Sequence, residues 1–172
     1  MKQLGAVFLL VAAAPASGEV ISATQNGFDV RQTVTVPASP TQAFAEFAHI
    51  GSWWSSQHSF SGNAANLTLD LQPGGCFCER LPAGGGVQHM HVSYLEPAKR
   101  VVLTGSLGPL LFLATTGVMD VQFAPGAKAT QVTMEYRVSG LFDGGADKMA
   151  PAVDRVLSEQ LQRYAAYVTN AR

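Results

Sequence analysis

The chain has 172 residues, of which 47% are apolar and 13% are charged, so it can bury a substantial core and is not a disordered chain. Eleven basic residues against twelve acidic ones give a net charge of -1. Without a block of like charge, the chain lacks the electrostatic footprint of a nucleic-acid-binding protein. No internal repeat is visible, and a single domain is therefore expected.

The N-terminal segment has the features of a secretory signal peptide. Lys2 supplies a positive start, residues 4–14 form an uninterrupted apolar run, and Ala14-Pro15-Ala16 offers the small residues of a cleavage site. The run is well short of the roughly 20 residues that a membrane-spanning helix needs. We therefore expect a signal peptide over residues 1–18, a periplasmic or secreted protein, and no stable membrane insertion after cleavage. The alternative is a short membrane anchor that stays attached.

The two cysteines, Cys76 and Cys78, are separated by one residue. In a regular strand their side chains project from the same face, with β-carbons more than about 6 Å apart, whereas a disulfide needs roughly 3.5 to 4.5 Å. The spacing therefore predicts two buried free thiols and not a mutual disulfide.

The mature chain begins with a strand and a short helical region. Residues 28–36 alternate between β-branched apolar and polar side chains and stop at Pro37, which predicts the first strand. Ser39, Pro40 and Gln42 combine an N-cap, a proline at the first helical position and a capping box, so a helix begins here. A second short helical segment is expected from Trp53-Trp54 to about residue 60.

A series of strands and one long helix follow. Period-two segments joined by short connections predict an antiparallel meander, with strands at residues 67–71, 76–81, 87–95, 100–105, 117–123 and 129–138. Residues 107–116 have no clear assignment, and an apolar hairpin at a cavity mouth is one interpretation. From Met149 onward, apolar residues recur at spacings of three and four, which predicts an amphipathic helix of about 23 residues.

This order of elements resembles the SRPBCC superfamily of START-like, helix-grip proteins, which includes polyketide cyclase-like proteins and relatives of a chaperone-ATPase activator. The resemblance covers about residues 28–168. The residues that carry it are short motifs distributed along the chain. They are residues 34–40 followed by Phe44 and Phe47, the pairs Trp53-Trp54, Gly74-Gly75 and Glu96-Pro97, and residues 101–104, 130–136 and 152–157. It implies an α+β domain over residues 28–170, in which a curved antiparallel sheet of about seven strands wraps around the C-terminal helix, with two short helices after the first strand. An apolar cavity is then expected between sheet and helix.

The register between strands 76–81 and 87–95 decides what the histidines can do. If residues 82–86 form a five-residue loop, Glu79 faces His89, and the cysteines lie on the opposite face with Met90 and Val92. A slip by one residue would instead bring Cys78 opposite His91 and build a site for zinc. The apolar pattern favours the first register, with no metal ion and no cofactor.

Glu79 and His89 are the candidate catalytic residues, because a carboxylate that orients an imidazole inside an apolar cavity suits a general base or a polar anchor for a ligand. If their face is convex, they form only a surface ion pair. No nucleophile elbow, phosphate-binding loop or dinucleotide fingerprint is present. The predicted ligand-binding residues are Trp53, Trp54, Phe60, Glu79, His89, Met119, Tyr136, Met149, Val153 and Leu157.

Three classes of function remain open. The first is an exported protein that binds a small hydrophobic molecule between the sheet and the C-terminal helix. The second is an enzyme of cyclase, dehydratase or isomerase type that uses Glu79 and His89 in the same cavity. The third is a protein-interaction module, although export would remove a cytosolic chaperone as its partner.

Overall fold

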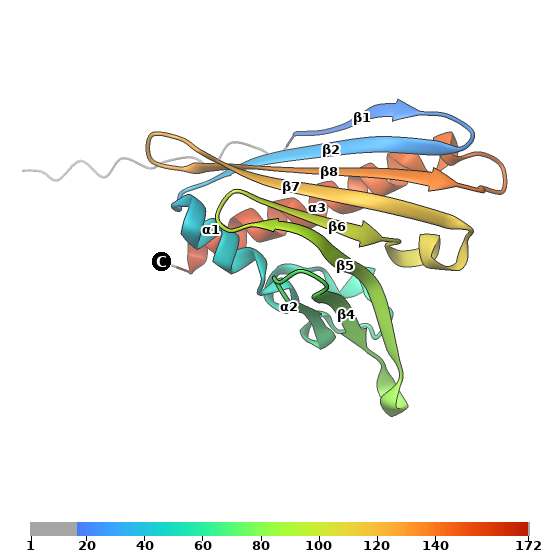
Figure 1. The fold of residues 1–172 in the computed structure, drawn as a ribbon, viewed down its shortest axis with the longest axis horizontal. Helices are drawn as coiled ribbons and strands as arrows, with labels where there is room; N and C mark the ends of the chain where they lie inside the picture. Colours follow the sequence, from blue (N-terminus) through green and yellow to red (C-terminus); the bar gives the residue numbers. More distant parts are fainter. Residues whose placement is uncertain (1–16, 172) are drawn as a thin grey trace, which may run out of the picture.

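The computed structural model describes residues 17–171, which form one eight-stranded antiparallel sheet and a long C-terminal helix (Figure 1). The strand order is β1-β2-β8-β7-β6-β5-β4-β3. The strands are β1 (Ser17–Ala23), β2 (Gly27–Val36), β3 (Leu67–Leu69), β4 (Cys76–Arg80), β5 (Gly86–Glu96), β6 (Arg100–Gly105), β7 (Thr115–Pro125) and β8 (Thr130–Gly140). The α-helices are α1 (Pro40–Phe47), α2 (Ile50–Trp53) and α3 (Ala150–Asn170), and the short 3-10 helices are η1 (Ser56–His58), η2 (Ala64–Asn66), η3 (Pro82–Gly84), η4 (Gly108–Phe112) and η5 (Ala146–Lys148). The predicted helix-grip architecture is confirmed.

The first predicted strand and helix, β2 and α1, are found where their sequence patterns indicate. Side chains along β2 alternate between buried and partly exposed, as the sequence pattern requires of a strand with one face on the core. The Ser39 hydroxyl accepts a hydrogen bond from the amide of Gln42, whose side chain in turn accepts from the Ser39 amide, so the predicted capping box starts α1. The helix α1 ends at Phe47, and α2 follows as a separate short helix.

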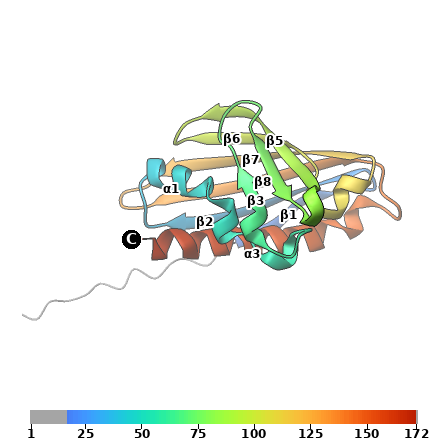
Figure 2. The ribbon, with the colours of Figure 1, turned by 90° about the horizontal axis from the view of Figure 1, so that it is seen from below.

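The helix α3 lies across the concave face of the sheet, against β1 and β2 (Figure 2). Its buried face consists of Ala150, Leu157, Gln160, Leu161, Tyr164 and Val168. The Tyr164 hydroxyl donates a 2.7 Å hydrogen bond to the carbonyl oxygen of Ala43 in α1, which ties the two helices together. Burial of this face supplies most of the contact between helix and sheet, since the free energy of burial grows with the apolar area removed from water.

The strand β1 was not predicted. It pairs with β2 from Ser17↔Thr33 to Ala23↔Phe28, and it makes the sheet one strand wider than the expected seven. Its side chains are all exposed, so no buried alternation marks it in the sequence. The expected signal peptide, residues 1–18, lies outside the described residues except for Ser17 and Gly18, which belong to β1.

The predicted register of β4 and β5 is wrong. Observed pairs are Phe77↔Met90 and Cys78↔Gln88, so the register shifts and His89 is the extra residue of a β-bulge. Because of this bulge, His89 and Met90 are both buried, and the odd-numbered residues of β4, rather than the cysteines, face inward. A bulge adds one residue to one strand and interrupts the period of two, so an alternating pattern does not reveal it.

The prediction of two buried free thiols is also wrong. Cys76 and Cys78 form a disulfide, and both are partly exposed on the outer side of β4. Their Cα atoms are 5.3 Å apart, within the range that a disulfide allows. The prediction assumed a regular extended strand, whereas β4 is contracted next to the register shift.

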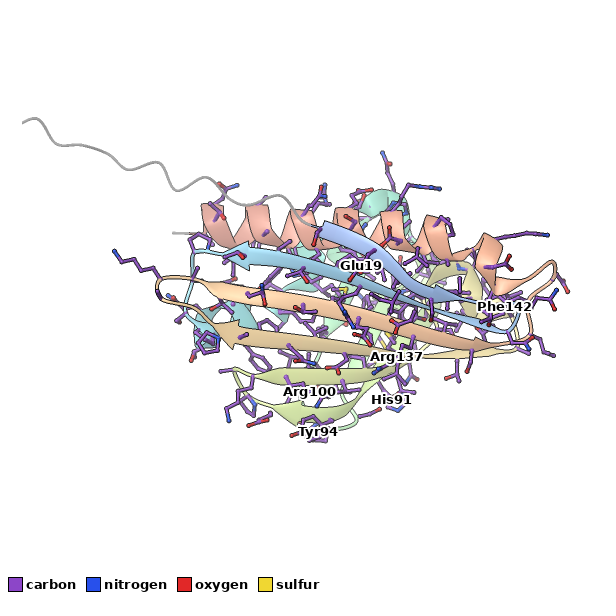
Figure 3. The ribbon with its side chains drawn as sticks, turned by 90° about the horizontal axis from the view of Figure 1, so that it is seen from above. Glu19, His91, Tyr94, Arg100, Arg137 and Phe142 are labelled. Atoms are coloured by element: carbon purple, nitrogen blue, oxygen red, sulfur yellow. A yellow bond between two sulfur atoms is a disulfide. The ribbon has the colours of Figure 1, made fainter. Side chains whose placement is uncertain are left out.

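The outer face of the sheet carries ion pairs. Arg31 donates to Glu135 at 2.7 Å, and Arg100 donates to Asp120 through both Nε and a terminal nitrogen. Figure 3 shows Arg100 beside Tyr94, whose ring centroid lies 5.9 Å from the guanidinium carbon. This face is therefore polar and solvated, and the apolar side chains of the sheet are directed to the side that α3 covers. No helix within residues 17–171 is long and apolar enough to cross a membrane.

Candidate functional site: a cavity beneath the C-terminal helix

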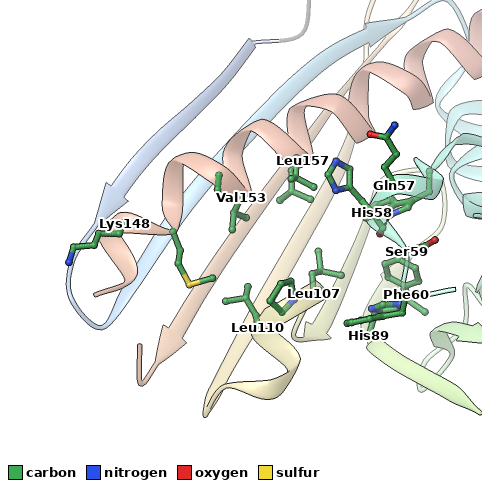
Figure 4. Close-up of a pocket in the computed structure, with 17 residues that line it drawn as sticks. Gln57, His58, Ser59, Phe60, His89, Leu107, Leu110, Lys148, Val153 and Leu157 are labelled. Carbon is green, nitrogen blue, oxygen red and sulfur yellow. Dashed lines mark hydrogen bonds between the residues drawn. The ribbon is translucent and has the colours of Figure 1, made fainter. Parts of the chain in front are cut away.

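A cavity of about 500 Å³ lies between α3, η4 and the β4–β5 hairpin (Figure 4). Its walls are mostly apolar and aromatic. The lining residues are Trp54, Gln57, His58, Ser59, Phe60, Phe77, His89, Leu107, Gly108, Pro109, Leu110, Lys148, Met149, Ala152, Val153, Val156 and Leu157. A pocket of this size and composition is typical of sites that enclose a small organic molecule.

Polar contacts from α3 hold one wall of the cavity in place. The Gln160 side chain is fully buried, and its oxygen accepts a 2.7 Å hydrogen bond from the amide of Ser55. Arg163 donates to the carbonyl oxygen of Trp53 at 2.9 Å. Trp54 lies between these anchors, and its indole N–H donates to the carbonyl oxygen of His58. The helix therefore positions the aromatic wall opposite its own apolar side chains.

The opposite wall is η4, which lies in residues 107–116, the segment without a clear assignment from the sequence pattern. The buried Tyr136 hydroxyl accepts from the amide of Leu107 at 3.2 Å and donates to the carbonyl oxygen of Gly105 at 3.3 Å. A β-carbon at Gly117 would overlap the Tyr136 ring, so glycine at this position of β7 leaves room for it. Burial raises the pKa of Tyr136 to about 12, which keeps the hydroxyl protonated as a donor.

Glu79 and His89 form a buried pair, of which His89 lines the cavity. Oε2 of Glu79 lies 3.0 Å from Nε2 of His89, although the two residues are diagonal in the ladder and not directly opposite. The carboxylate also accepts hydrogen bonds from the backbone amides of Phe60 and Ser61. Glu79 is 1% exposed and His89 is 5% exposed, so the concave placement, and not the surface ion pair, is correct.

The surroundings of the pair determine its charge. Burial pushes the pKa of Glu79 upward, but hydrogen bonds from Ser61, Phe60 and His89 together outweigh burial and hold the pKa below the ordinary 4.5. Burial lowers the pKa of His89 below 6.5, and the hydrogen bond and charge of Glu79 offset this only in part. At neutral pH the arrangement is thus an ionised carboxylate beside a neutral imidazole.

Aromatic rings enclose the imidazole. Phe60 stacks on it with ring centroids 5.8 Å apart, and Phe77 packs at a tilt with a centroid distance of 5.0 Å. The exposed ring of Phe112 meets Phe60 edge-on at the outside of this stack. These rings contribute to the burial of the imidazole, which is 5% exposed.

The structure brings six of the ten predicted ligand-binding residues to the cavity wall: Trp54, Phe60, His89, Met149, Val153 and Leu157. Glu79 does not line the cavity itself, but it is hydrogen-bonded to two residues that do, His89 and Phe60. Trp53 is a core residue, 1% exposed, whose indole N–H donates to the carbonyl oxygen of Phe47. Met119 and Tyr136 are likewise buried without lining the cavity. Whether the six residues bind a ligand stays a prediction.

Several lining residues were missed. Residues 57–59 and 107–110 belong to irregular segments and short 3-10 helices, which carry no periodicity from which a facing side can be derived. The unassigned apolar run at residues 107–116 was nevertheless a usable signal, because an apolar segment outside the regular elements must be covered or must line a cavity. Its structure is a 3-10 helix and not the hairpin suggested above.

The alternative zinc site does not form in the observed register. Cys76 is opposite His91, but both cysteines are bonded to each other. Among residues 17–171, no three His, Cys, Asp or Glu side chains gather closely enough to hold a metal ion.

Comparison with known proteins agrees with this architecture. Residues 27–169 match the family described as polyketide cyclase / dehydrase and lipid transport. The chain belongs to this family. The membership confirms the SRPBCC resemblance inferred from sequence, and the match begins at the first residue of β2 and ends in the last turn of α3. A search of curated proteins finds no significant match.

Solved structures include other helix-grip proteins similar to this family member. An uncharacterized protein from Rhizobium leguminosarum is 18% identical, with coverage of 90% of this chain and 98% of the other, and a TM-score of 0.61. DynU16, a protein of the dynemicin biosynthetic locus, is 17% identical over 84% of this chain and 48% of its own, with a TM-score of 0.60. CalU16 from Micromonospora echinospora is 10% identical over 88% and 84%, with a TM-score of 0.55. At these identities the similarity shows the fold alone.

Proposed function

We propose that this protein is an exported carrier or sensor that holds a small hydrophobic molecule in the cavity beneath α3. The observation that carries the proposal is the cavity itself: about 500 Å³, enclosed by aromatic and aliphatic side chains from α3, η4 and β4. Transfer of an apolar molecule into such a pocket is favourable because it removes apolar surface from water. Membership in a family whose description includes lipid transport supports the same function.

Export is the second part of the proposal. The signal-like segment at residues 1–18 motivates it, and the disulfide between Cys76 and Cys78 supports it. Disulfides form and persist in oxidising compartments such as the periplasm and are rare in the cytosol. The expected location is therefore the periplasm or the outside of the cell.

Binding of the uncharged fluorophore 1,6-diphenylhexatriene tests the carrier function. Its fluorescence should rise saturably with one molecule bound per chain. Val153→Trp should reduce the affinity at least about tenfold, because the larger side chain on α3 would occupy the cavity. Ala166→Trp, on the exposed side of the same helix, is the matched control and should bind as the unaltered protein does.

Two results would contradict the carrier function. One is the absence of saturable binding. The other is binding that Val153→Trp and Ala166→Trp leave equally intact, which would place the fluorophore elsewhere on the surface. Circular dichroism of both variants establishes that any loss is not due to unfolding.

An enzyme of cyclase, dehydratase or isomerase type is the second candidate, and one observation favours it. A neutral imidazole held by an ionised carboxylate at an apolar wall is suited to remove a proton next to a carbonyl group. The ketone 2-tetralone in deuterated water provides a test, since a base in the cavity would accelerate exchange of its α-protons. Exchange that is equally fast with His89→Phe would remove this candidate. The structure adds no observation in favour of a protein-interaction module.

A further inference from the structure

The disulfide between Cys76 and Cys78 lies on the outer face of the sheet, on the side of β4 that is turned away from the cavity. Both cysteines are partly exposed. Their ladder partners are Thr68 in β3 and His91 and Gln88 in β5, and all three are exposed. The strands on both sides therefore leave this part of the face solvated, and a thiol in solution can approach the disulfide from outside.

The exposure and the spacing of the two cysteines both favour reactivity. Structural disulfides of secreted proteins resist reduction by glutathione, whereas exposed disulfides are more oxidising and are the labile, regulatory or catalytic ones. Both sulfurs also belong to one strand of five residues, with a single residue between them. Once one sulfur has reacted with an external thiol, the other stays close to it, so the step that reverses or completes the reaction is intramolecular.

Basic side chains lie on the same face as the disulfide. His91 is the ladder partner of Cys76, and the side chains of directly paired residues project from one face with β-carbons about 4.5–5.5 Å apart. Arg80 is exposed two residues beyond Cys78, so it projects to the same side of β4. Imidazole and guanidinium groups beside a cysteine stabilise its thiolate, which makes that sulfur a better leaving group.

Two carboxylates in this region leave that balance intact. Glu79 is directed inward and is 1% exposed. Asp70, whose amide donates to the carbonyl oxygen of Cys76, is exposed, and its carboxylate accepts a hydrogen bond from Gln72. The inward carboxylate is thus separated from the sulfurs by the sheet, and the other is solvated.

We propose that Cys76 and Cys78 form a thiol–disulfide exchange site that oxidises two cysteine thiols of another polypeptide. A substrate thiolate attacks Sγ of Cys78, the bond between the two sulfurs breaks, and Cys76 leaves as a thiolate beside His91. The second substrate thiol then attacks the substrate sulfur of the mixed disulfide and releases Cys78.

The balance of this reaction is complete. The substrate loses two electrons and gains a disulfide, and the protein gains two electrons and two thiols, which take up the protons of the substrate thiols. A small-molecule disulfide such as oxidised glutathione regenerates the site through the same steps in reverse. An open sheet face accommodates a polypeptide as a substrate. This activity does not depend on the cavity or on the carrier function.

Equilibration with glutathione is the first test. The folded protein is incubated at millimolar glutathione with increasing ratios of the reduced to the oxidised form, its thiols are alkylated, and the product is weighed by mass spectrometry. We expect the protein to gain two alkyl groups progressively along the series, because an exposed disulfide exchanges with this pool. A disulfide that stays intact throughout would be structural and would overturn the proposal.

Oxidation of a peptide with two cysteines is the second test. With oxidised glutathione present, catalytic amounts of the protein should accelerate formation of the peptide disulfide over glutathione alone. The double variant Cys76→Ser, Cys78→Ser should lose this acceleration and keep its circular dichroism spectrum. No acceleration by the unaltered protein, or equal acceleration by the double variant, would show that the two cysteines do not catalyse the exchange.

The positioning role of His91 has its own control. His91→Gln should slow peptide oxidation about threefold, since the leaving thiolate of Cys76 is less stabilised, and His91→Lys should restore the rate by returning a positive charge. His49→Gln removes an exposed imidazole outside the sheet and should leave the rate unchanged. Equal rates in all four proteins would exclude His91 from the reaction.

Discussion

The guanidinium of Arg163 on α3 donates a 2.9 Å hydrogen bond to the carbonyl oxygen of Trp53, the last residue of α2. The carbonyl oxygens at a helix end lack partners within the helix, and a positively charged side chain stabilises them. The C-terminal helix therefore does more than cover the sheet, because it also fixes the point at which the chain turns into the aromatic wall of the cavity.

We expect Arg163→Ala to destabilise the protein by about 1 kcal/mol, the value of an ordinary hydrogen bond, and to weaken binding of 1,6-diphenylhexatriene, because Trp54 follows the released carbonyl. Urea unfolding and fluorescence titration measure the two effects. Arg155→Ala, an exposed arginine on the same helix, is the control. Equal behaviour of the two variants would show that the contact does not position the wall.

The helix–sheet core is tested with Leu161, which is fully buried and does not line the cavity. Leu161→Ala should lower the free energy of unfolding by about 2–5 kcal/mol, since the lost side chain leaves a void in a close-packed region. The neighbouring Gln162→Ala, at an exposed position, should change it by less than about 0.5 kcal/mol. Similar urea midpoints for both would mean that the buried face of α3 is assigned wrongly.

The stability of the protein should fall as the solution is acidified below about pH 6.5. His89 has a lowered pKa in the folded state, so the unfolded chain binds the proton first. Its contribution is fully present above the unfolded pKa of about 6.5 and decreases from there down to the folded pKa. Glu79, also with a lowered pKa, contributes a second loss at more acidic pH, as the solution falls from the ordinary 4.5 through the folded pKa.

Urea unfolding of His89→Phe measures the first of these two losses. Its free energy of unfolding should change less between about pH 7 and pH 5.5 than that of the unaltered protein, because the titrating imidazole is gone. His58→Gln, which removes an exposed imidazole, is the control. The same pH dependence in all three proteins would exclude His89 as its source.

The expected signal peptide covers residues 1–18, and its end overlaps the start of β1 at Ser17. Cleavage directly before Ser17 keeps every ladder pair of this strand, whereas cleavage before Val20 removes the pairs of Ser17, Gly18 and Glu19 with β2. We therefore expect protein isolated from its native host to begin at Ser17. N-terminal sequencing decides this, and a chain that still begins at Met1 would overturn the proposal of a cleaved signal peptide.

The elements with local signals were predicted well. The alternation of buried and exposed residues in β2 and the capping box of α1 depend only on residues that are close in the sequence. Both are found where they were expected. The pairing of β4 with β5 depends instead on a bulge at His89, which interrupts the alternation on which the sequence-based register rests. For this reason His89 was correctly predicted as the partner of Glu79, although the predicted register, in which the two residues are directly opposite, is wrong.

The candidate site was predicted in part for similar reasons. Val153 and Leu157 follow from the period of α3, whose apolar face must be directed to the sheet or to the space beside it. Leu110, in the 3-10 helix η4, and Leu107, directly before it, were not predicted to bind a ligand, because so short a helix has no strong sequence pattern. The structure also shows that Glu79 contacts Nε2 of His89 and that the buried Nδ1 has no hydrogen-bond partner among the described residues. Which ring nitrogen meets the carboxylate depends on the folded geometry and could not be predicted from the sequence.

The disulfide between Cys76 and Cys78 encloses a single residue, Phe77, which is buried against the cavity and packs on His89 and Trp54. A crosslink restricts the unfolded chain less as the loop it closes becomes shorter, so this one adds little resistance to heat or urea. It instead constrains β4 locally, on both sides of Phe77, which lines the cavity. Protein prepared under reducing conditions would therefore pass ordinary tests of integrity and still differ from oxidised protein in ligand affinity, so the oxidation state of each preparation has to be known before affinities are compared.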